Sequence, residues 1–191
     1  DADVYRLGLQ SRFDPGMNET FAERILTVRR ELTDRIAQDP KLKDLVELWD
    51  MKTFNPSASL AENLFFAVPT DPEITPEMMP EIPEVKDFLT SAGLDKKFQE
   101  IGLKIAETMV ELFANVSGDS GLLGNYSFIT QDELPDFERM IRVARSGQQK
   151  PGLSENDKVR LLSLAFKLVP ARHRLGIVND ELQSQIIAAR A

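Results

Sequence analysis

The sequence contains no cysteine and only one histidine among its 191 residues. Without cysteine the chain forms no disulfide, no thiolate metal site and no cysteine nucleophile. The single histidine, His173, is not paired with a carboxylate at a metal-binding spacing. We expect a solvated or carbonyl-bonded imidazole in a turn, with a pKa lowered by the neighbouring cations Arg172 and Arg174.

The chain has little positive charge and no long apolar run. Lys and Arg number 23 against 31 Asp and Glu, which gives a net charge of −8. A nucleic-acid surface needs clustered cations, so nucleic acid is not an expected partner. Apolar runs such as 64–68 are too short to cross a bilayer, so we expect no direct membrane insertion.

A nucleotide-binding loop is also missing. The pattern G-x-x-x-x-G-K-[ST], whose backbone amides and lysine hold phosphates, occurs nowhere in the sequence. The chain opens with Asp1-Ala2-Asp3, without an initiator methionine or a secretory signal. We interpret residues 1–191 as a single helical domain, a fragment of a longer chain. Five prolines within 69–83 mark a linker or wrapping loop and a possible internal boundary.

What is present is helical periodicity. Behind a candidate N-cap at Asn18, apolar residues recur at three- and four-residue steps until Pro40, which predicts a helix over 18–39. The stripe consists of Phe21, Ile25, Val28, Leu32 and Ile36.

Similar stripes and capping residues predict the remaining helices. They are a short one over 42–49, one over 60–68 capped by Ser57 or Ser59, one over 85–92 closed by Gly93, and one over 95–115 capped by Asp95. Three more follow: one behind the Thr130–Glu133 pair, or behind Asp132 as an alternative cap that suits Pro135 better, and ending at Ser146; one over 154–169; and one from Asn179 through Ile186. The only strand candidates are 126–129 and 176–178. The sequence therefore predicts an all-α bundle of about eight helices with a Pro-rich internal loop.

The run Phe54-Asn55-Pro56-Ser57-Ala58-Ser59-Leu60-Ala61-Glu62-Asn63-Leu64-Phe65-Phe66 is the most specific motif. It resembles the segment of ATP-binding-cassette (ABC) transporter ATPases where the Q-loop region enters the helical subdomain. Two further stretches, 107–114 and 168–176, resemble parts of a large helical insertion in bacterial ABC transporter ATP-binding proteins. With them the resemblance covers about residues 45–190.

The resemblance implies a helical accessory domain near the coupling helix of a transporter's membrane domain. It implies contacts with the rest of the cassette and with that membrane domain, at the cytoplasmic face of the membrane. By this resemblance, ATP and Mg²⁺ would bind elsewhere in the parent chain, and neither would bind this fragment. Candidate partner contacts are Phe54, Asn55, Glu62, Asn63, Leu64, Phe66, Arg172 and Arg174. No catalytic, cofactor-binding or metal-binding residue is carried over.

The sequence departs from ordinary cassettes in several ways. Ala67 stands where a glycine commonly follows the Glu-Asn element, and no Q-loop glutamine precedes Phe54. The run 146–149 lacks the first Leu and the second Gly of Leu-Ser-Gly-Gly-Gln, and we interpret it as a helix-ending turn.

Simpler interpretations stay open for the candidate residues. Leu60, Leu64 and Phe65 would be core while Glu62 and Asn63 face water, and Arg172 and Arg174 would lie in a solvated turn rather than bind an anion. A free-standing helical interaction domain is the alternative function.

Overall fold

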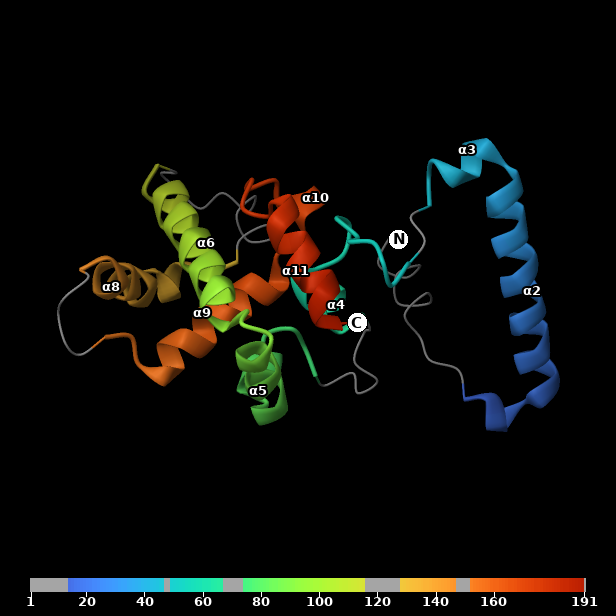
Figure 1. Cartoon of the computed structure of the whole chain (residues 1–191), viewed down its shortest axis with the longest axis horizontal. Helices are drawn as coiled ribbons and strands as arrows, with labels where there is room; N and C mark the ends of the chain where they lie inside the picture. The colour runs from blue at the N-terminus through green and yellow to red at the C-terminus, as the bar shows by residue number, and fades with distance from the viewer. Residues whose placement is uncertain (1–13, 47–48, 67–73, 116–127, 147–151, 191) are drawn as a thin grey trace. The chain divides into compact units, whose positions relative to one another are not determined.

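The computed structural model describes residues 14–46, 49–66, 74–115, 128–146 and 152–190. These residues form nine α-helices and three short 3-10 helices, and none of them lies in a strand (Figure 1). The predicted all-α fold is confirmed. The strand candidate 176–178 is not a strand, nor are residues 128–129; residues 126–127 lie outside the described ranges.

Backbone contacts divide the chain into two compact units, Asp1–Leu48 and Trp49–Ala191. The possible boundary at 69–83 stays a prediction, and its first part, 69–73, lies outside the described residues. Within the part of the chain that is described, no helix is long and apolar enough to cross a bilayer.

The first unit is built on one long helix, α2 (Glu19–Gln38). Asn18 caps it as predicted, because its side-chain oxygen accepts a hydrogen bond from the amide of Phe21 at 3.0 Å. The short helix α3 (Pro40–Lys43) follows. Of the helix predicted over 42–49, only residues 42 and 43 are helical, as the end of α3; residues 44–46 and 49 are not helical, and 47–48 lie outside the described residues. Leu45 and Trp49 are 80% and 47% exposed. Without burial, so short a helix lacks the tertiary packing that stabilises it.

In the second unit, the long helix α6 (Asp95–Asn115) is central. It packs against α9 (Glu155–Lys167), α8 (Leu134–Arg145) and α5 (Pro83–Ser91), with α9 crossing it (Figure 1). The 3-10 helix η2 (Met79–Glu81) lies against α5 and α9. Four of the five residues of the apolar stripe predicted on α6 are core, because Phe98, Ile101, Ile105 and Met109 are all 6% exposed or less. The fifth, Leu112, is 44% exposed.

The helix crossing depends on Gly102. A Cβ atom placed there would lie 1.9 Å from the carbonyl oxygen of Leu161 on α9, so the two backbones approach more closely than a side chain permits.

Local capping explains most helix starts. Ser154 and Asp157 form a capping box at α9, and Thr130 and Glu133 form another at the 3-10 helix η3 (Gln131–Glu133) before α8. Gly93 closes α5 as predicted: its φ of 67° is the left-handed conformation that glycine adopts easily at the end of a helix.

The predicted cap at Asp95 is wrong, because Asp95 is already the first residue of α6 and Leu94 precedes it. The carbonyl of Leu94 accepts the amide of Phe98 at 2.9 Å, and Asp95 lies in the first turn, where its charge suits the helix dipole.

The helix α4 (Leu60–Phe65) and the C-terminal helix α11 (Asp180–Arg190) pack on each other, and α4 also contacts α9. The predicted helix over 60–68 is shorter than expected, since Phe66 takes the left-handed conformation with a φ of 50°. Val68 lies outside the described residues. Asn179 caps α11 as predicted, accepting the amide of Leu182 at 2.9 Å.

Candidate functional site

The run 54–66 forms a turn followed by α4. Ser59 caps α4: its hydroxyl accepts the amide of Glu62 at 3.1 Å, while the Glu62 carboxylate accepts the amide of Ser59 at 2.7 Å. Of the two predicted caps, Ser59 is therefore the cap. Glu62, a candidate partner contact, is half-buried and holds the start of the helix.

The turn is closed by two asparagines. Asn63 accepts the amide of Asn55 at 2.8 Å and donates its side-chain NH₂ to the carbonyls of Asn55 and Ser59 at 2.8 and 3.0 Å. Asn63 is 0% exposed, so it does not face water as the simpler interpretation expected. A buried amide with this many partners fixes the turn against the helix.

Arg190, at the end of α11, holds the other end of α4. Its guanidinium donates to the carbonyls of Asn63 at 2.8 Å and Met51 at 3.0 Å, and also to those of Asp50 and Thr53. Burial lowers the pKa of Arg190 from its ordinary value. The guanidinium also lies 4.8 Å from the centre of the Phe66 ring.

Sequence reasoning missed Arg190, because no local pattern shows a partner 127 positions away.

The stretch 168–176 joins the run 54–66 directly. The amide of Leu60 donates to the carbonyl of Leu168 at 2.9 Å, and the amide of Ala171 donates to the carbonyl of Pro56 at 2.9 Å. We call residues 54–66 and 168–176 together the platform. Two stretches more than 100 residues apart are therefore joined into one element by backbone hydrogen bonds.

The eight candidate contact residues all lie on the platform but differ in exposure. Arg172 and Arg174 are exposed. Phe54, Glu62 and Phe66 are half-buried, whereas Asn55, Asn63 and Leu64 are buried. The buried three shape the platform, and the other five form the part that a partner can touch directly.

A hollow of about 270 Å³ lies at the edge of the platform, lined by residues within 168–178 that include Arg174. Its lining is apolar apart from Arg174, and it includes Leu168, Leu175 and Val178. Arg174 closes the short helix α10 (Pro170–His173) in the left-handed conformation, with a φ of 49°. An apolar hollow with one cation at its rim suits an apolar side chain next to a carboxylate.

The His173 side chain contacts the start of α10 and the ring of Phe128. Its Nδ1 accepts the amide of Val169 at 2.9 Å, and its ring lies 4.4 Å from that of Phe128. We expected the imidazole to be solvated or bonded to a carbonyl. That expectation is wrong, because the ring is half-buried and accepts a hydrogen bond from the backbone amide of Val169. Burial, and next the charge of Arg172, lower the pKa of His173, in the predicted direction.

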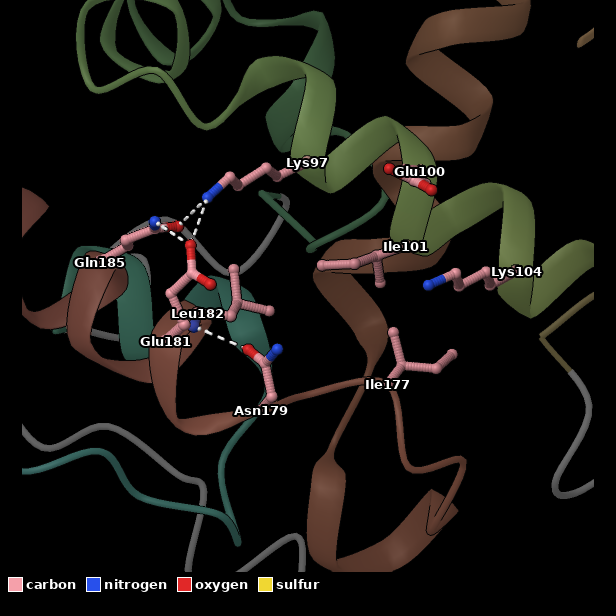
Figure 2. A pocket seen from close by; sticks show the side chains of 9 residues that line it. All are labelled: Lys97, Glu100, Ile101, Lys104, Ile177, Asn179, Glu181, Leu182 and Gln185. Atoms are coloured by element: carbon pink, nitrogen blue, oxygen red, sulfur yellow. Dashed lines mark hydrogen bonds and ion pairs between the residues drawn. The ribbon is translucent and has the colours of Figure 1, made fainter.

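A second pocket, of about 260 Å³, lies between α6 and α11 (Figure 2). On one side, Lys97 reaches Glu181 at 3.3 Å and Gln185 at 2.6 Å. Lys104 borders it without an ion pair to any described residue, and Ile101, Ile177 and Leu182 make it partly apolar. The Lys97–Glu181 ion pair links the two helices, which is a structural role.

The described residues hold no cluster of three or more His, Cys, Asp or Glu side chains suited to a metal ion. Glu133, part of a paired carboxylate, serves the capping box instead.

Comparison with known proteins adds no relative: no family model, no curated protein and no solved structure matches this chain.

Proposed function

We propose that the chain is a helical accessory domain of an ABC transporter ATP-binding subunit. It transmits or regulates ATP-driven movement through protein contacts at the cytoplasmic face of the membrane. Its partners are the remainder of the cassette and the transporter's membrane domain, and the platform is its contact surface. ATP and Mg²⁺ belong to the parent chain.

One observation carries this proposal. The runs 54–66 and 168–176 each resemble the same family, and the fold joins them through the Leu60–Leu168 and Ala171–Pro56 hydrogen bonds. Chance similarities in a chain of this length have no reason to meet in space. The resulting platform is held rigidly by Asn63 and Arg190, which suits a surface that passes on a movement.

The proposal gives the chain no catalytic role. The sequence has no phosphate-binding loop, and the groups that hold the platform are committed to internal hydrogen bonds. We expect no ATP hydrolysis by the isolated polypeptide above the background of buffer.

The decisive experiment is to read the coding sequence on both sides of this segment. A phosphate-binding loop upstream and Leu-Ser-Gly-Gly-Gln downstream in the same frame are expected. A stop codon directly after Ala191, with no upstream cassette half, would reject the transporter assignment. That result would favour the alternative, a free-standing helical interaction domain using the same platform.

A second experiment tests the platform in the intact subunit. Arg174→Glu reverses the charge at the rim of the hollow, and should weaken binding to the membrane domain by about twofold to fivefold, as for an exposed ion pair. Arg142→Glu makes the same charge change on an exposed site of α8 and is the control. Equal effects of the two variants would show that the hollow is not the contact.

A further inference from the structure

The apolar stripe of α2 is exposed. Ile25, Val28 and Leu32 are 40%, 60% and 54% exposed, and Phe21 is 47% exposed. Only Ile36 at the end of the stripe is buried. Exposed apolar side chains at three- and four-residue steps along one helix are typical of a surface that pairs with another helix.

We propose that α2 pairs antiparallel with α2 of a second copy of this chain. The stripe has the heptad spacing of a coiled-coil seam, with Ile25 and Leu32 at one core position and Phe21 and Val28 at the other. A two-fold axis between residues 26 and 27 makes the contact self-complementary, as in most homodimers.

The register follows from the spacing. Around this axis, Ile25 faces Val28 of the second copy, and Phe21 faces Leu32 of the second copy. Symmetry repeats both pairs, which gives four apolar layers. A shift of one heptad would place Arg35 or Asn18 opposite an apolar side chain and lose layers, so this register buries the most apolar surface.

Charge decides the orientation. Arg24 and Glu31 lie along the same border of the stripe, and neither is in any of the salt bridges among the described residues. In the antiparallel pair Arg24 lies opposite Glu31 of the second copy, and symmetry makes this attraction twofold. In a parallel pair Arg24 would instead lie opposite Arg29 of the second copy, which is repulsive.

Sedimentation equilibrium of the full chain over a range of concentrations tests the pairing. We expect a reversible dimer, and Val28→Asp should abolish it by placing charge in a central layer. Val28 is 60% exposed, so this variant keeps the fold, which circular dichroism can verify.

Charge exchange tests the contact at Arg24. Arg24→Glu should weaken the dimer about tenfold, because two attractions become repulsions. The double variant Arg24→Glu with Glu31→Arg should restore it. Arg30→Glu changes the same charge on the opposite side of the helix and should leave the dimer unchanged.

Orientation can be measured separately, because the chain has no cysteine of its own. A spin label on Gln38→Cys lies near the end of α2. Two labels should be roughly 35 Å apart in the antiparallel pair, from the rise per helical residue, but only about 10 Å apart in a parallel one.

Three results would overturn the proposal. They are a chain that stays monomeric at the highest concentration, a dimer that survives Val28→Asp, or a dimer that Arg24→Glu strengthens. Each is independent of the transporter assignment, which the coding sequence decides.

Discussion

The helices α2 and α6 have nearly the same length and the same kind of stripe, yet opposite surroundings. α2 has 20 residues and α6 has 21. Ile105 in the stripe of α6 is 0% exposed, whereas Val28 in the stripe of α2 is 60% exposed. Periodicity therefore predicts a helix and its apolar face, but not whether other helices of the same unit cover that face. The stripe of α6 is covered because α6 packs against three helices of its own unit, α9, α8 and α5.

Gly102→Ala should have the largest effect on the unit built around α6. Alanine favours a helix in isolation, but its Cβ would lie 1.9 Å from the Leu161 carbonyl oxygen, and backbone does not yield as a side chain does. We expect a loss of more than about 3 kcal/mol of unfolding free energy, measured by urea denaturation.

Gly152→Ala is the matched control for that change, since nothing lies within 4 Å of its added Cβ. Its effect should stay within about 0.5 kcal/mol. Equal stability of the two variants would mean that α6 and α9 are not in such close contact.

Truncation within the two stripes compares them directly. Ile105→Ala should cost about 3 kcal/mol, because it leaves a cavity in a fully buried site. Leu32→Ala, at a residue 54% exposed, should cost less than about 0.5 kcal/mol. Thermal unfolding at low protein concentration, where α2 is unpaired, gives both values. A comparable loss from both variants would contradict the contrast between the helices.

Two asparagines that act near helix starts extend the comparison. Asn63→Ala should cost about 2 kcal/mol, because it leaves the buried amide of Asn55 without its acceptor and removes the side-chain NH₂ that ties the turn to α4. Asn18→Ala removes one exposed cap and should cost about 1 kcal/mol. Urea denaturation of both variants checks the order; a larger loss at Asn18 would show that Asn63 does not fix the turn.

Helix starts were predicted correctly where a capping residue within the same short stretch of sequence determines them. Asn18, Ser59 and Asn179 cap as their sequence positions predict, because capping needs only the three following residues. The predicted cap at Asp95 was wrong, because Leu94 takes the position before the helix and Asp95 is already the first residue of α6.

Distant contacts were beyond sequence reasoning. Nothing near Arg190 indicates that it binds the carbonyl of Asn63, and nothing near Gly102 indicates the carbonyl of Leu161. The candidate site was predicted as separate stretches, and their meeting at Pro56 and Ala171 required the fold. The exposure of the α2 stripe was also beyond sequence reasoning, since an apolar stripe does not indicate which element will pack against it.

We also expect a weak dependence of stability on pH within the second unit. Arg139 donates to both carboxylate oxygens of Asp157, at 3.2 and 2.5 Å, and this pairing lowers the pKa of Asp157 from 3.8 to about 2. The stabilisation is therefore complete above pH 3.8 and is lost as the pH falls through about 2. Since the Arg139 side chain is 47% exposed, we expect only on the order of 1 kcal/mol.

Asp157→Asn tests this pairing while keeping an oxygen that can accept the amide of Ser154, as Asp157 does at 3.0 Å. Unfolding free energies of the variant should fall less steeply than those of the parent chain between pH 4 and pH 2, the window set by the two pKa values. Glu155→Gln removes an exposed carboxylate two residues away, whose ion pair among the described residues is with Lys158, and should change that slope less. If Glu155→Gln changed the slope more than Asp157→Asn, the ion pair with Arg139 would not be the source of the acid sensitivity.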